Sequence, residues 1–73
     1  MQAEQRTVYE ICLAGHLDYQ WRDWFEGMTL FQHQDGTTRL IGAVDQAGLH
    51  GILKKIRDIG APLIFVMPTD KEI

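Results

Sequence analysis

Residues 15–27 read GHLDYQWRDWFEG, and this stretch decides between the two folds that the rest of the chain allows. Its three large rings, Trp21, Trp24 and Phe25, have the spacing i, i+3 and i+4, which places them on one face of a short helical turn. Asp18 can cap the start of that turn, and Gly27 can end it. So short a turn is stable only when its rings are buried, so we expect a cap on the core rather than a ligand platform.

Extended segments are predicted on both sides of the aromatic turn. Residues 7–17, TVYEICLAGHL, are rich in the β-branched and aromatic side chains that favour a strand. Residues 28–34 and 37–44 have the pattern of two further strands, and the pair Asp35-Gly36 between them is a strong hairpin signal. Gly42, inside the third strand, indicates a bulge or a close packing contact.

The second half of the chain predicts a helix followed by a strand. Asp45 stands at the N-cap position, Gly60 fits the position just beyond the helix, and Pro62 prevents its continuation. The helix has one apolar stripe, made of Leu49, Ile52, Leu53, Ile56 and Ile59. Residues 63–67, LIFVM, form a last strand that is apolar on both faces, and Pro68 ends it.

The order strand, short helix, strand, strand, helix, strand predicts an α+β fold of the ferredoxin-like two-layer type, an antiparallel sheet with both helices on one face. The alternative is a βββαβ meander, because the nine residues 18–26 are fewer than the dozen or so that a crossover usually needs. We expect one small domain over residues 1–73, with a frayed N-terminus at 1–6 and a C-terminal tail at 69–73.

Composition and charge argue against several classes of partner. The formal net charge is −3, and the only basic cluster, Lys54, Lys55 and Arg57, is interrupted by Asp58, so neither nucleic acid nor an anionic membrane is expected. No apolar run resembles a signal core or a membrane span. The lone Cys12 excludes an internal disulfide and suits a reducing, cytoplasmic setting, where we expect it to be a buried structural residue rather than a nucleophile.

The sheet face opposite the helices is a candidate interface. The apolar residues expected there are Val8, Cys12, Ala14, Phe31, Ile41 and Ala43, with Phe65 or its neighbours from the last strand. The polar residues that interrupt them are Glu10, His16, His33 and Arg39. An exposed apolar patch usually marks an interface, and a chain of 73 residues buries only a modest core, so we expect a homodimer or larger assembly. The alternative is a surface of merely mixed character.

A partner protein is a further possibility, because tryptophan is enriched among residues that dominate binding energy. If one ring of the aromatic turn is exposed, the turn becomes a docking surface, with Arg22 and Asp23 adding polar contacts. The residues predicted to bind a partner or a second copy are Trp21, Trp24, Phe25, Phe31, Ile41 and Phe65.

Two His-x-Asp pairs, His16 with Asp18 and His33 with Asp35, are candidates for metal binding or for a general base with its orienting acid. Each aspartate also has a structural explanation, because Asp18 caps the aromatic turn and Asp35 belongs to the hairpin. No cysteine cluster supports a metal, so we expect structural roles for these residues, and no cofactor.

The start of the predicted helix is a candidate ligand site, formed by Asp45, Gln46, Gly48 and His50. Asp45 would repel an anion and suits an amine or an amino acid. The stretch DQAGLHGILKKIRDIGAPLIFV resembles the helix-and-strand portion of ACT domains, although it lies in the second half of this chain rather than the first. The resemblance implies amino-acid binding at a subunit interface.

Three segments, GHLDYQWRDWF, DGTTRLIG and VDQAGLHGILKKIRDIGAPL, together resemble a group of short uncharacterised bacterial proteins over most of residues 15–63. That resemblance implies a bacterial origin and no particular activity. Our first hypothesis is therefore a small non-enzymatic homo-oligomeric adaptor or regulatory module. The second is a sensor of a small amino-acid-like ligand, and the third is a small enzyme that uses His16 or His33 as a base.

Overall fold

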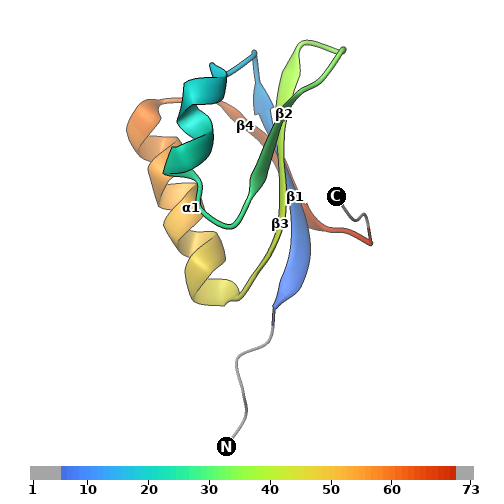
Figure 1. Cartoon of the computed structure of the whole chain (residues 1–73), viewed down its shortest axis with the longest axis vertical. Helices are drawn as coiled ribbons and strands as arrows, with labels where there is room; N and C mark the ends of the chain where they lie inside the picture. The colour runs from blue at the N-terminus through green and yellow to red at the C-terminus, as the bar shows by residue number, and fades with distance from the viewer. Residues whose placement is uncertain (1–5, 71–73) are drawn as a thin grey trace, which may run out of the picture.

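The computed structural model describes residues 6–70 as a four-stranded antiparallel sheet with a helical layer on one face (Figure 1). The elements are β1 (Thr7–Ala14), the 3-10 helix η1 (Tyr19–Trp24), β2 (Thr29–Gln32), β3 (Thr37–Val44), α1 (Gln46–Ile59) and β4 (Leu63–Pro68). The predicted α+β class and the antiparallel sheet are confirmed. Of the expected frayed ends, residues 1–5 and 71–73 lie outside the described part of the chain.

The strand order is β2-β3-β1-β4, and every neighbouring pair is antiparallel. β1 pairs with β3 and β4 but not with β2, so the βββαβ meander is wrong. The crossover is possible because β1 ends at Ala14, earlier than predicted, and β2 begins at Thr29. The connection therefore has 14 residues rather than nine, which meets the usual requirement.

A buried threonine fixes the early end of β1. The side chain of Thr38, in β3, is fully buried. Its Oγ1 donates a hydrogen bond to the carbonyl of Gly15 and accepts one from the amide of Leu17, both at 2.8 Å. Gly15 itself has a positive φ of 81°, a conformation that glycine adopts without strain. The chain therefore turns away from the sheet at Gly15 instead of continuing as a strand to Leu17.

The ends of α1 agree with the prediction from its caps. The Asp45 carboxylate accepts a hydrogen bond from the amide of Gly48 at 2.7 Å, which satisfies one of the unpaired amides of the first turn. At the other end, Gly60 adopts the left-handed conformation and its amide donates to the carbonyls of Ile56 and Arg57. Neither helix of the described chain is long and apolar enough to cross a membrane.

The core lies between the sheet and the helical layer. Its buried members come from every element of the fold except η1 and β4: Ile11, Leu13, Phe25, Met28, Leu30, Leu40, Val44, Leu49, Ile52 and Ile56. Of the predicted apolar stripe on α1, Leu53 and Ile59 are only half-buried and pack at the margin of this cluster.

Gly42 makes a close packing contact rather than a bulge. It pairs with Tyr9 in an unbroken β1–β3 register. A Cβ atom at this position would collide with the carbonyl oxygen of Gly27 and approach the sulfur of Met28. The absence of a side chain at Gly42 therefore allows the end of the crossover to lie directly on β3.

Candidate functional site

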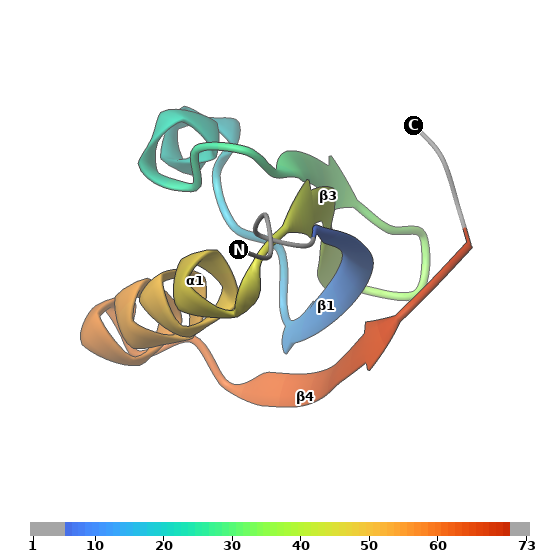
Figure 2. The same cartoon turned by 90° about the horizontal axis from the view of Figure 1, so that it is seen from below.

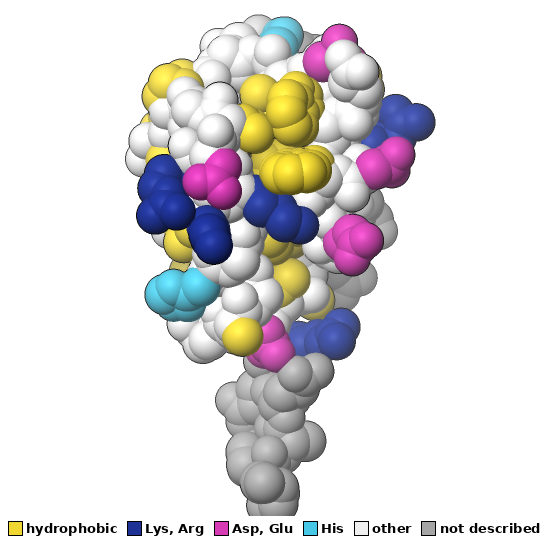
Figure 3. Space-filling view, turned by 90° about the vertical axis from the view of Figure 1, so that its left-hand side faces the viewer, with side chains coloured by type: hydrophobic (Ala, Val, Ile, Leu, Met, Phe, Trp, Pro, Cys, Tyr) yellow, Lys and Arg dark blue, Asp and Glu magenta, His cyan; other side chains and the backbone are white. Residues whose placement is uncertain are grey.

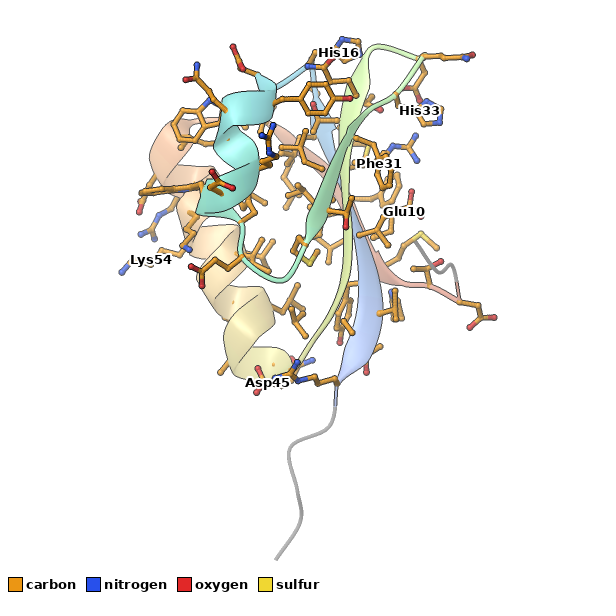
Figure 4. All side chains as sticks on the ribbon, viewed as in Figure 1. Glu10, His16, Phe31, His33, Asp45 and Lys54 are labelled. Carbon is orange, nitrogen blue, oxygen red and sulfur yellow. The ribbon has the colours of Figure 1, made fainter. Side chains whose placement is uncertain are left out.

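The candidate site is the face of the sheet that points away from α1 and η1. Figure 2 shows both helices on one side of the sheet, and no element of residues 6–70 covers the other side. Figure 4 shows Glu10 and Phe31 on this uncovered side. We call it the open face, defined by eight residues of the four strands: Glu10, Cys12, Thr29, Phe31, Arg39, Ile41, Phe65 and Met67.

The pairing register of the strands places these residues in two rows across the sheet. Phe31, Arg39, Cys12 and Phe65 follow one another across β2, β3, β1 and β4. In this row the guanidinium of Arg39 lies 5.4 Å from the centroid of the Phe65 ring, a distance typical of a cation–π contact. The second row consists of Thr29, Ile41, Glu10 and Met67.

A buried ion pair joins the two rows. Arg39 Nη1 donates to Glu10 Oε2 at 2.7 Å, and the side chains are only 17% and 5% exposed. Arg39 Nη2 also contacts Asp35 Oδ2 at 2.9 Å, and this carboxylate stands at the edge of the face. The hydrogen bond with Glu10 raises the pKa of Arg39 above its ordinary value, so the guanidinium stays charged. The centre of the open face therefore carries opposite charges that neutralise each other.

Asp35, at the edge of this face, has a lowered pKa. Hydrogen bonds from the hydroxyl of Thr37, and then from its amide, lower the pKa of Asp35 to about 2. The nearby positive charge of Arg39 acts in the same direction, and desolvation opposes it. Asp35 is thus a fixed negative charge at neutral pH that holds the hairpin and orients Arg39.

The rest of the open face is mainly apolar and partly accessible. Phe31 is 38% exposed and Met67 is 46% exposed, whereas Cys12 and Ile41 are buried between their neighbours. Phe65 is half-buried under Arg39. Of the other residues expected on this face, Val8 is half-buried, and Ala14 and Ala43 are exposed. The predicted interface residues Phe31, Ile41 and Phe65 therefore lie together on one surface.

The aromatic turn divides its three rings between core and surface. Phe25 is fully buried, so it belongs to the core and is not accessible to a partner. Trp21 is half-buried, and Trp24 is 44% exposed. A 3-10 helix has three residues per turn, so Trp21 and Trp24 share a face and Phe25 does not. The prediction of a cap is correct for Phe25, partly correct for Trp21 and wrong for Trp24.

The two His-x-Asp pairs have different geometries. His33 Nδ1 lies 3.2 Å from Asp35 Oδ1 in the exposed hairpin. Asp18 instead caps η1, accepting a hydrogen bond from the amide of Gln20 at 2.9 Å, while His16 Nε2 bonds the carbonyl of His33 at 2.8 Å. Among residues 6–70 no three His, Cys, Asp or Glu side chains gather as a metal site would require.

Only some of the residues predicted to bind a ligand at the start of α1 lie together. Asp45 and Gly48 line a cavity of about 290 Å³, together with Arg6 and Glu26. Gln46 instead donates a hydrogen bond to the hydroxyl of Tyr9 at 2.8 Å. His50 is exposed on α1 and does not line this cavity.

On the sequence alone, Glu10 and Arg39 are only polar interruptions of an apolar face, and their ion pair is not predicted. Their opposite charges and their positions on the predicted strands were the available signal. The pairing could be found only after β1 had been placed next to β3, because that register puts Cys12 opposite Arg39 and Glu10 one row away.

Comparison with known proteins places the chain in a family. No curated protein and no solved structure matches it. A family model described as a domain of unknown function (DUF8691) matches residues 8–67, which include all six elements of the fold except the ends of β1 and β4. The match agrees with the resemblance to short uncharacterised proteins. The chain therefore belongs to the DUF8691 family.

Proposed function

We propose that this domain is a non-enzymatic homo-oligomeric module, and that its open face binds a second copy of the same chain. The observation that carries the proposal is the Glu10–Arg39 pair in the middle of that face, with exposed apolar side chains at its margins, Phe31 and Met67. As an adaptor or regulator, the assembled module would present its helical layer to other proteins.

The electrostatics of the open face favour self-association. Burying an unpaired charge in an interface is expensive, but Glu10 and Arg39 already satisfy each other within one chain. A second copy can therefore cover the pair without supplying a counter-charge. Most homodimers use a two-fold contact in which one surface meets itself. Pairing of Glu10 with Arg39 at the centre reduces the like-charge repulsion that such a contact otherwise brings, and the second carboxylate of Arg39, Asp35, lies at the edge of the face.

Size also supports a second copy as the occupant. A domain of 73 residues has a small core relative to its surface, and chains of this size often gain stability from a partner subunit.

We infer further that the fold is a reduced ferredoxin-like plait in which η1 takes the place of the first helix. β1 and β2 are parallel with β3 between them, and β3 and β4 are parallel with β1 between them. Each half of the chain thus has the form of a split β-helix-β unit, which supports this assignment. A plait leaves one sheet face without helices, as the proposed interface requires.

Sedimentation equilibrium with two matched variants tests the proposal. Phe31→Asp places a charge on the open face, and Tyr19→Asp places the same charge on η1 at a similarly exposed aromatic residue. We expect the unmodified chain and Tyr19→Asp to form dimers or larger species, and Phe31→Asp to be monomeric. Equal dissociation of both variants, or a monomeric unmodified chain, would contradict the proposal.

A small-ligand sensor is the second candidate. A basic residue, Arg6, and a second acidic residue, Glu26, also line the cavity that contains Asp45. An amino acid carries the complementary ammonium and carboxylate groups, which is consistent with the resemblance to ACT domains. Thermal denaturation with a panel of amino acids and nucleotides tests this candidate, since a ligand that binds the folded state raises Tm. No change in Tm with any compound would remove it.

We also propose that the protein is cytoplasmic. Cys12, the only cysteine of the chain, is buried in the sheet, where it packs as a small apolar residue without needing a disulfide.

A further inference from the structure

We propose that the chain has a second binding site, on η1, for a small organic cation such as an N-methylated amine. The site is a cavity of about 450 Å³ lined by Gln20, Trp21, Asp23 and Trp24. Its size falls in the range of small-molecule pockets. It lies in the helical layer and is therefore on the opposite side of the sheet from the open face.

Two tryptophan rings form the walls of this cavity. The centroids of Trp21 and Trp24 are 6.0 Å apart and their planes are inclined at 81°, so the rings make a corner rather than a stack. The 3-10 geometry of η1 produces this corner, because residues three apart lie on one face of such a helix. Figure 3 shows hydrophobic side chains exposed on this side of the molecule, between basic and acidic side chains.

The lining selects for positive charge. The faces of indole rings carry negative electrostatic potential, which attracts cations, and quaternary ammonium groups are bound by aromatic corners of this kind. Asp23 adds a full negative charge to the rim, and within residues 6–70 no ion pair engages its carboxylate. Of residues 6–70, none that lines the cavity is basic, although the Lys55 ammonium lies beside the Trp24 ring.

The chain itself provides an example of the proposed contact. The Nζ atom of Lys55 lies 5.5 Å from the centroid of the Trp24 ring, held there by a 2.8 Å hydrogen bond to the backbone carbonyl of Trp24. Lys55 is not among the residues that line the cavity. The Trp24 ring thus already binds one ammonium group, whose charge opposes a second cation at that ring. A cationic ligand in the cavity would therefore lie against Trp21 and Asp23.

Spectroscopy of the two indoles gives a direct test, because the chain contains only these two tryptophans and both line the cavity. The full chain is titrated with tetramethylammonium chloride while both indole N–H signals are followed by NMR. Sodium chloride at equal ionic strength controls for salt. tert-Butanol, which has nearly the same shape and no charge, controls for simple apolar binding. We expect saturable shifts of both indole signals with tetramethylammonium only.

Two variants that replace a carboxylate with a carboxamide test whether Asp23 contributes to binding of the cation. Asp23→Asn removes the carboxylate of this cavity, and Glu26→Gln makes the same charge change at a residue that lines the other cavity. We expect Asp23→Asn to raise the dissociation constant for tetramethylammonium about two- to fivefold, as loss of an exposed ion pair does, and Glu26→Gln to leave it unchanged. Indole signals that do not shift, equal shifts with tert-butanol, or equal effects of the two variants would overturn the proposal.

Discussion

Arg39 and Glu10 form an ion pair with a 2.7 Å contact on the face of the sheet that no element of residues 6–70 covers. Both side chains are largely buried although they lie outside the core between sheet and helices. Each of the two side chains is covered by the other and by neighbouring residues of the strands. The pair therefore contributes both to the stability of one chain and to the character of the surface that we propose as its interface.

Removing one member of this pair is expected to destabilise the fold. Among residues 6–70, Glu10→Gln leaves the partly buried Arg39 guanidinium with Asp35 as its one charged partner. We expect the free energy of unfolding to fall by about 2 kcal/mol. Urea denaturation measures the change. Asp58→Asn is the matched control, because Asp58 pairs with Arg57 at 3.5 Å on the exposed side of α1 and should contribute little. Equal losses in the two variants would contradict the assigned importance of the buried pair.

Asp35 is expected to make the stability of the folded chain depend on pH in the acid range. Its pKa is about 2 when folded, below the ordinary value of 3.8, so the folded state favours the carboxylate. The resulting stabilisation is fully present above about pH 4 and is lost as the pH falls through 2. An NMR titration of the Asp35 carboxyl measures its pKa directly.

Thr37 provides the control for this titration, because its hydroxyl is the largest cause of the lowered pKa. Thr37→Val removes the hydroxyl and keeps the amide, so we expect the pKa of Asp35 to rise toward 3.8. An unchanged pKa in this variant would show that another group stabilises the carboxylate.

Two glycines are expected to respond oppositely to alanine. Gly42→Ala forces a methyl group against the backbone carbonyl of Gly27, and we expect a loss of about 2 kcal/mol of stability, as overpacking produces. Gly51 lies in the exposed middle of α1 with open space around it, so Gly51→Ala should stabilise the chain by up to about 1 kcal/mol. Thermal denaturation of both variants compares them. A neutral Gly42→Ala would mean that the crossover does not lie on β3 at this point.

Thr38 is expected to be sensitive to loss of its hydroxyl group. Thr38→Val keeps the shape but leaves the carbonyl of Gly15 and the amide of Leu17 without this partner, and we expect a loss of about 1 to 3 kcal/mol. Thr38→Ser keeps the hydroxyl and should retain these hydrogen bonds, as amide hydrogen exchange at Leu17 can report. Rapid exchange in the serine variant and slow exchange in the valine variant would contradict this role.

The parts of the fold that depend on local rules could be predicted from the sequence. The limits of α1 follow from Asp45 and Gly60, whose capping preferences act within one turn of the helix. The hairpin follows from Asp35 and Gly36, since Gly36 adopts a positive φ of 90°. These features require no knowledge of distant contacts.

The early end of β1 could not be predicted in this way. It depends on Thr38, which follows Gly15 by 23 residues and becomes its neighbour only when β1 pairs with β3. The exposure of Trp24 could not be predicted for a different reason. Residues i, i+3 and i+4 share one face of a helix with 3.6 residues per turn, and η1 has three.

The sequence predicts which apolar residues form the candidate site, but not the ion pair at its centre. Alternation along the strands places Phe31, Ile41 and Phe65 on one face, as expected. The ion pair at its centre depends on the order and register of strands, which the residues of β1 alone do not determine.

The most direct test of the proposed interface is isotope-filtered NMR on a mixture of labelled and unlabelled chains, which detects contacts only between different copies. We predict intermolecular contacts to the ring of Phe31 and the methyl groups of Ile41 and Met67, and none to Tyr19 or Phe25. A sample without intermolecular contacts at high protein concentration, or with contacts confined to the helical layer, would contradict the claim that the open face binds a second copy.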